Sequence, residues 1–160
     1  MGKVILICGK IGSGKTTYAR KLAKQLNAVI LTHDEIMLGL FGAQLYENEP
    51  EQFSKYCTWV ESYVKRKAGE AAKAGAIAIC ENGFWSRSER DELREFYAGM
   101  NVTCKLHYMD IPEEQRIQNI NKRNKAVRQG ELGYCFTQEK DIHHFFEIPS
   151  NDEIDFRVST

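Results

Sequence analysis

The chain has 160 residues, enough for one domain that buries about two thirds of its unfolded surface without disulfide or metal staples. Lys plus Arg and Asp plus Glu both number 22, so the formal charge is zero. This balance argues against a long nucleic acid as the main partner, because phosphate backbones are held by excess positive charge. The five cysteines form no C-x-x-C pair or metal-ligand spacing, and no apolar run approaches the ~20 residues of a membrane span. We therefore expect reduced thiols, no membrane association and a cytoplasmic location.

A glycine-rich motif lies near the start of the chain, between a predicted strand and a predicted helix. Residues 3–8 form a short apolar run typical of a buried parallel strand, and residues 16–26 are predicted to be a helix. The segment between them, residues 9–16, reads Gly-Lys-Ile-Gly-Ser-Gly-Lys-Thr and matches the phosphate-loop pattern G-x-x-x-x-G-K-[ST]. Because both flanking elements are those that the motif requires, we interpret it as a phosphate-binding loop rather than a glycine-rich turn.

Each residue type in this loop suits the binding of a nucleoside triphosphate. Glycines let the backbone curl, so that successive N–H groups converge on phosphates at the positive end of the following helix. Lys15 can place its cation against the β and γ phosphates, and the Thr16 hydroxyl suits a Mg²⁺ ion that keeps several waters. The predicted nucleotide-binding residues are Gly9, Gly12, Ser13, Gly14, Lys15, Thr16 and Thr17.

Further along the chain, predicted strands alternate with predicted helices. Strand-like apolar runs occupy residues 28–31, 76–80 and 102–109, and residues 153–158 are predicted to form a closing edge strand. One helix is predicted to begin at Thr32, and a later one is predicted to end near Lys73. A further helix is predicted to begin at the Ser86–Glu89 capping box, and two more are predicted to cover residues 112–128 and 137–147. Strands joined through helices imply right-handed crossovers, and hence a parallel sheet covered on both faces. We predict a single α/β domain over residues 1–160, with a sheet of about five strands flanked by helices.

Acidic residues follow three of the predicted strands, at the carboxyl edge where ligands bind in such sheets. Asp34 could take the proton of an acceptor hydroxyl during phosphoryl transfer, or could simply cap the next helix. Glu81 stands where phosphate-loop proteins keep an acid for Mg²⁺, although it could also be a polar strand end. Asp110 competes as a metal ligand, but Pro112 close behind it favours a turn or cap role.

The predicted helix over residues 112–128 carries three arginines. Arg116 and Arg123 are two helical turns apart and so lie on one face, and Arg128 follows near the end of the helix. If this helix and the loop after it close over the site, the guanidinium groups would neutralise charge that develops on the transferred phosphoryl group. The alternative is a solvated basic helix.

Five segments of the sequence together resemble one family. They are the phosphate loop, T-H-D-E at 32–35, E-N-G-F-W-S-R-S-E-R-D-E-L-R at 81–94, K-R-N at 122–124, and F-F-E-I-P-S-N-D-E at 145–153. In these segments the chain resembles the small P-loop kinases related to polynucleotide kinase, chloramphenicol phosphotransferase and zeta toxin. Among them it is most similar to the bacterial AAA-type ATP-binding proteins.

The resemblance implies a P-loop NTPase fold with a helical lid over about residues 112–135, and ATP and Mg²⁺ as ligands. By the same resemblance, Asp34 corresponds to the acid that activates the acceptor, Lys15 and Thr16 to phosphate and metal contacts, and Arg123 and Arg128 to lid arginines. Two departures stand out. Glu81 replaces the usual aspartate, and residues 37–39 contain no arginine, where polynucleotide kinases grip the acceptor phosphate. The second departure weakens the case for a nucleic-acid acceptor.

We therefore expect an ATP-dependent phosphotransferase, a kinase that moves the γ-phosphoryl group to a hydroxyl of a small-molecule or nucleotide acceptor. Its predicted catalytic residues are Lys15, Asp34, Arg123 and Arg128, and its predicted metal ligands are Thr16 and Glu81. One alternative is a 5′-hydroxyl polynucleotide kinase, suggested by the basic clusters at residues 65–67 and 122–128. The other is a non-catalytic nucleotide-dependent switch, suggested by the unusual glutamate. No obligate protein partner is evident.

Overall fold

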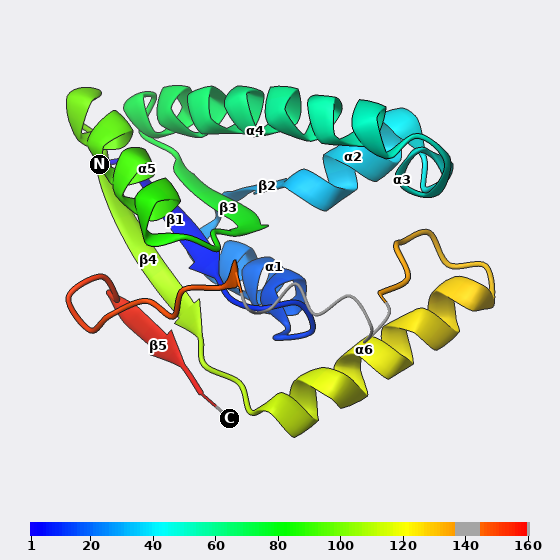
Figure 1. The fold of residues 1–160 in the computed structure, drawn as a ribbon. Coiled ribbons are helices and arrows are strands. Elements are labelled where there is room, and N and C mark those ends of the chain that lie inside the picture. The colour runs from blue at the N-terminus through cyan, green and yellow to red at the C-terminus, as the bar shows by residue number, and fades with distance from the viewer. Residues whose placement is uncertain (137–144, 160) are drawn as a thin grey trace.

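In the computed structural model, which describes residues 1–136 and 145–159, five parallel strands form one sheet with helices on both faces (Figure 1). The strands, whose spatial order is β2-β3-β1-β4-β5, are β1 (Lys3–Cys8), β2 (Val29–Thr32), β3 (Ile77–Gly83), β4 (Thr103–Met109) and β5 (Phe156–Val158). The helices are α1 (Lys15–Leu26), α2 (His33–Phe41), α3 (Gln44–Asn48), α4 (Pro50–Lys73), α5 (Arg87–Gly99) and α6 (Glu113–Arg128). The predicted parallel sheet is confirmed.

The central strand β1 is apolar along its whole length because helices cover both sides of it. Val4, Leu6 and Cys8 face the core formed with α4 and α5. Ile5 and Ile7 point to the opposite face, where α1 packs. All five of these side chains are at most 1% exposed, so the strand is a rigid support for the loop that follows it.

The strand register brings the polar strand ends together. Glu81 near the end of β3 pairs with Ile7 in β1 on one side and with Thr32 in β2 on the other. The phosphate loop begins two residues after Ile7, and Asp34 lies two residues after Thr32. The predicted meeting of these groups at one edge of the sheet therefore follows directly from the pairing.

Some local predictions need correction. The short helix α3 was not predicted, and the last strand covers only Phe156–Val158 rather than residues 153–158. The strand is shorter because the backbone turns at Ser150–Glu153, where the Glu153 N–H donates to the Ser150 carbonyl. Of the predicted helix 137–147, residues 137–144 lie outside the described residues, and residues 146 and 147 are not helical.

The predicted capping box at the start of α5 is present. The Ser86 side chain accepts a hydrogen bond of 3.1 Å from the Glu89 N–H, and the Glu89 carboxylate accepts one of 2.9 Å from the Trp85 N–H. These bonds satisfy donors that the first helical turn leaves without partners. They also fix the backbone just after β3, next to the carboxyl edge of the sheet.

Helix α6 departs from the sheet after β4 and extends along the side of the molecule, as Figure 1 shows in yellow. The segment after it, drawn in orange, turns back toward α3. Within residues 1–136 and 145–159, no helix combines the length and the apolar character that crossing a bilayer needs.

Candidate active site

The phosphate loop connects β1 to α1 through two glycines in the left-handed region of backbone conformation. Gly12 has φ 78° and Gly14, the N-cap of α1, has φ 83°. Space around Gly14 is open, so only its backbone conformation calls for glycine there. Gly12 is additionally constrained by packing, since a Cβ there would lie 2.6 Å from the Arg116 carbonyl oxygen and 2.8 Å from Ile120 Cγ1.

Helix α6 is bonded to the outer side of the loop. Arg116 donates from Nη1 to the Ile11 carbonyl, and Asn119 donates from Nδ2 to the Gly12 carbonyl at 2.8 Å. Because the C=O and N–H of one planar peptide point in opposite directions, holding these carbonyls outward turns the following N–H groups inward. Arg116 is 2% exposed and also bonds Glu113, so it supports the loop, whereas the Arg123 side chain is 39% exposed.

The donors inside the loop fit a phosphate ligand. The Ser13 side chain is 2% exposed, and its hydroxyl has no hydrogen-bond partner in the part of the chain that the structure describes. Lys15 is half-buried, and its ammonium group donates to the Lys10 carbonyl at 3.0 Å. Burial lowers the Lys15 pKa, and the negative charges of Glu81 and Asp34 oppose that effect. A triphosphate would satisfy the orphaned hydroxyl and offer the ammonium group stronger partners.

The remaining predicted loop residues frame this site. Gly9 donates its N–H to the Gly83 carbonyl at 3.1 Å, and a Cβ at Gly9 would lie 2.7 Å from Ser13 Oγ. Glycine at this position therefore makes room for the loop to close over β1. Thr17 is exposed in the first turn of α1.

Thr16 and Glu81 supply oxygen atoms side by side at the base of the loop. The Thr16 hydroxyl donates to Glu81 Oε2 at 3.1 Å, and Glu81 is 7% exposed. Burial raises the Glu81 pKa, and the nearby Lys15 ammonium opposes the rise. No group of three or more His, Cys, Asp and Glu side chains within the described ranges is arranged to hold a metal by itself. Two oxygen donors beside a phosphate site suit Mg²⁺, which keeps several waters and shares the phosphate oxygens.

Asp34 lies in the first turn of α2, two residues after the N-cap Thr32. Its carboxylate is 3.5 Å from His33 Nδ1 and 4.0 Å from Arg123 Nη2. Burial alone would raise the Asp34 pKa, but bonding to His33 and the charges of Arg123 and Lys15 hold it below its ordinary value. The group is therefore ionised at neutral pH and can accept a proton.

The two predicted lid arginines differ in position. The Arg123 guanidinium stacks over the Phe136 ring at 4.7 Å and faces Asp34. Arg128 is exposed in the last turn of α6, and no hydrogen bond or ion pair joins it to the other predicted site residues among those described. Asp110 pairs with Arg157 at 2.6 Å, so the structure places it in a surface ion pair.

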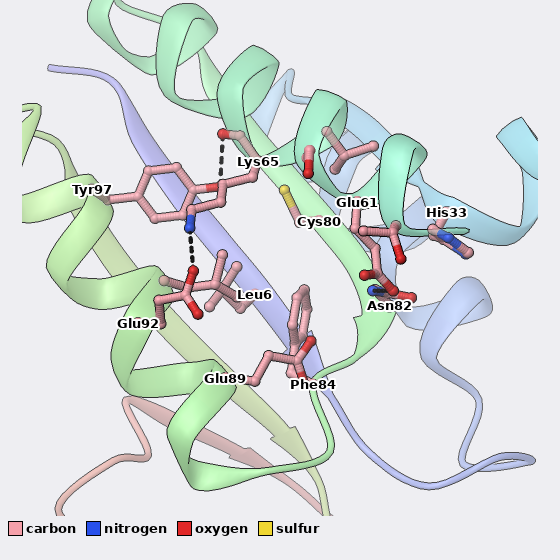
Figure 2. A pocket seen from close by; sticks show the side chains of 14 residues that line it. Leu6, His33, Glu61, Lys65, Cys80, Asn82, Phe84, Glu89, Glu92 and Tyr97 are labelled. Atoms are coloured by element: carbon pink, nitrogen blue, oxygen red, sulfur yellow. Dashed lines mark hydrogen bonds and ion pairs between the residues drawn. The ribbon is translucent and has the colours of Figure 1, made fainter. Parts of the chain in front are cut away.

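A cavity of about 200 Å³ opens beside the site, between α4 and α5. Figure 2 shows His33, Glu61 and Asn82 at one end of it and Lys65, Glu92 and Tyr97 at the other. The residues of α4 that line the cavity lie between Thr58 and Lys65, and the sequence analysis did not single them out as pocket residues. The available signal was a set of polar residues on α4 next to its buried positions Val60 and Val64.

The fold and this site define a P-loop nucleotide-binding protein of the kinase-like class. Residues 4–132 match the family described as the AAA domain, and the chain belongs to that family. No curated protein matches the sequence.

Solved structures confirm the fold. A candidate kinase from Chloroflexus aurantiacus is 17% identical with a TM-score of 0.73, over 99% of this chain and 85% of that one. The Mycobacterium tuberculosis APS kinase CysC, in complex with AMPPNP and APS, is 20% identical with a TM-score of 0.65, over 99% and 88%. A gluconokinase from Sinorhizobium meliloti is 15% identical with a TM-score of 0.60, over 98% and 82%.

Proposed function

We propose that this protein is an ATP-dependent kinase that transfers the γ-phosphoryl group to a hydroxyl of a small acceptor molecule. The observation that carries the proposal is the meeting of four charged groups at the carboxyl edge of the sheet. Asp34, Arg123, Lys15 and Glu81 come from four different segments, and each lies close enough to shift the pKa of another. Such electrostatic coupling in a cleft is typical of catalytic groups.

In the proposed reaction, the loop N–H groups and Lys15 hold the β and γ phosphates. The acceptor oxygen attacks the γ phosphorus while its proton passes to the Asp34 carboxylate. One P–O bond forms to the acceptor, the bond to the β–γ bridging oxygen breaks, and ADP departs with that electron pair. Arg123 faces Asp34 at 4.0 Å and neutralises charge on the phosphoryl oxygens. Arg128 is the second proposed lid arginine, at the exposed end of α6.

Thr16 and Glu81 are the residues that would hold Mg²⁺. When bound, this ion neutralises charge on the phosphate oxygens and orients them. Glutamate at position 81 reaches the Thr16 hydroxyl directly, so the longer side chain does not separate the two donors.

A small acceptor is favoured over a polynucleotide. The cavity beside His33 has a volume of about 200 Å³, below the range of pockets for larger ligands. The basic cluster at residues 65–67 is also internally neutralised, because Lys65 pairs with Glu92 at 2.7 Å and Lys67 pairs with Glu70 at 2.6 Å. Steep loss of oligonucleotide binding with rising salt would restore the polynucleotide alternative.

The test is ADP release with a panel of acceptors that contains D-gluconate, D-ribose, adenosine 5′-phosphosulfate, chloramphenicol and a 5′-hydroxyl oligonucleotide. With any acceptor that the wild type uses, Asp34→Asn should lower kcat by about 10²- to 10⁴-fold, because the general base is lost. Asp110→Asn is the matched control, since its carboxylate lies in a surface ion pair, and it should retain wild-type kcat. Full activity of Asp34→Asn would remove Asp34 from the reaction. Tight ATP binding without transfer to any acceptor would favour the nucleotide-dependent switch.

A further inference from the structure

Tyr134 buries a hydroxyl group that has no partner. The residue is 5% exposed, and its Oη atom has no hydrogen-bond partner among the described residues. Burial of a hydroxyl without a hydrogen bond is destabilising, so native proteins rarely keep one without a reason. One such reason is a ligand that the group is positioned to meet.

The ring is held firmly from two sides. It packs against Tyr46 of α3 at a centroid distance of 5.3 Å and against Phe53 of α4 at 5.8 Å. The segment that carries it is fixed to α6, because Asn124 Nδ2 donates to the Phe136 carbonyl at 2.6 Å and Asn124 Oδ1 accepts from the Phe136 N–H at 2.9 Å. These contacts fix the position of the ring.

The same segment leads to the proposed catalytic groups. Phe136, two residues after Tyr134, stacks on the Arg123 guanidinium, which in turn lies 4.0 Å from Asp34. Burial, followed by the negative charge of Asp34, raises the pKa of Tyr134 to about 12. The hydroxyl is therefore protonated at neutral pH and can donate a hydrogen bond.

The position of Tyr134 favours the acceptor over the nucleotide. The first half of α6 bonds the phosphate loop through Arg116 and Asn119. Tyr134 follows the other end of that helix and packs on α3 and α4, the helices between β2 and β3. Tyr134 thus packs against helices that follow Asp34 in the chain, away from the end of α6 that bonds the phosphate loop.

We propose that Tyr134 is a specificity-determining residue that donates a hydrogen bond to the acceptor. The acceptor class that suits this contact has a second oxygen next to the reacting hydroxyl, as in a vicinal diol or a 2-hydroxy acid. Asp34 takes the proton of the first oxygen, and Tyr134 binds the second. This assignment rests on the proposed kinase activity.

The first test needs no turnover. Melting temperatures are compared for the wild type, Tyr134→Phe and Tyr18→Phe, where the Tyr18 hydroxyl has a 2.8 Å bond to His107 Nδ1. Tyr18→Phe should lower the melting temperature by about 2–4 °C, because a satisfied hydrogen bond is lost. Tyr134→Phe should leave it unchanged or raise it. A drop equal to that of Tyr18→Phe would show that the Tyr134 hydroxyl is already bonded, and would overturn the proposal.

The second test uses the panel compound with the highest wild-type kcat/KM, together with its analogue that lacks the oxygen next to the reacting hydroxyl. Tyr134→Phe should lower kcat/KM for the compound by about five- to a hundredfold, with the KM for ATP within about twofold of wild type. The analogue should show no further loss in Tyr134→Phe, because the two changes remove one contact.

Three outcomes decide against the assignment. An unchanged kcat/KM for the acceptor in Tyr134→Phe would show that the proposed contact is not made, while the proposed kinase activity would still stand. An equal rise in the KM for ATP would show that the Tyr134 hydroxyl contacts the nucleotide and not the acceptor. If the wild type transfers phosphate to no compound in the panel, the proposed function itself fails and the assignment falls with it.

Discussion

The buried ion pair between Arg90 and Glu153 gives the sharpest prediction about stability. Arg90 is fully buried and Glu153 is 5% exposed, with N···O distances of 2.8 Å from Nε to Oε1 and 3.3 Å from Nη2 to Oε2. Arg90 Nη1 also donates to the carbonyls of Phe84 and Glu147, both at 3.0 Å. The pair thereby ties α5 to the end of β3 and to the segment before β5.

Two routes give similar magnitudes for the loss of this pair. Burial alone would raise the Glu153 pKa, but bonds from Arg90 and Ser150 lower it from 4.5 to about 2. At about 1.4 kcal/mol per pKa unit, this lowering makes the ionised carboxylate worth about 3 kcal/mol to the folded state. Independently, leaving one partner of a buried pair unpaired costs about 3–5 kcal/mol. We therefore expect Glu153→Gln to lower the free energy of unfolding by about 3 kcal/mol at pH 7.

Urea denaturation of wild type and variant from pH 7 to pH 3 tests this reasoning. Because the folded-state pKa is depressed, the contribution is fully present above pH 4.5 and is lost as pH falls toward about 2. The difference between the two proteins should accordingly shrink on acidification. Asp152→Asn is the control, since its side chain is 68% exposed beside Arg87 and solvent screens the pair, so the free energy of unfolding should stay close to that of wild type. A loss below about 1 kcal/mol in Glu153→Gln, or a difference that does not change with pH, would refute the argument.

Four further substitutions test the phosphate loop and a helix cap. Gly12→Ala forces a Cβ to within 2.6 Å of the Arg116 carbonyl oxygen and should weaken binding of a fluorescent ATP analogue at least tenfold. In Gly14→Ala the added Cβ meets open space, so backbone strain alone should lower the free energy of unfolding, by about 1–2 kcal/mol. Asn119→Ala removes the 2.8 Å bond to the Gly12 carbonyl, and should lower nucleotide affinity with an unfolding free energy within about 1 kcal/mol of wild type. Ser86→Ala removes the N-cap of α5 and should lower the free energy of unfolding by about 1 kcal/mol in urea denaturation, with unchanged nucleotide affinity. Equal nucleotide affinity in both glycine variants would contradict the packing argument.

The phosphate loop and the order of strands and helices could be predicted because their signals are local. The G-x-x-x-x-G-K-[ST] pattern needs only eight consecutive residues, and apolar runs identify buried strands one at a time. Asp34 and Glu81 could be placed at one edge because parallel strands bring their carboxyl ends together. The pairing of Thr32 with Glu81 shows that this reasoning captured the geometry.

Contacts between distant segments could not be predicted. Arg116 and Asn119 bond the phosphate loop from more than 100 positions away, and Arg90 meets Glu153 across 63 positions. Arginine, asparagine and glutamate are usually surface residues, so their types gave no sign of burial. The helical spacing of Arg116 and Arg123 was correct, but spacing alone could not show that the first arginine binds backbone carbonyls.

The bonds of Arg116 and Asn119 to the phosphate loop fix the first half of α6 in place. At about 1.5 Å per residue, Arg123 is about 10 Å from the Arg116 anchor and Arg128 is about 18 Å from it. A tilt of about 10° around the anchor would move the first guanidinium by about 2 Å and the second by about 3 Å, while the loop stays in place. Such a tilt of α6 would change the arginine positions while the bonds of Arg116 and Asn119 to the phosphate loop stay in place.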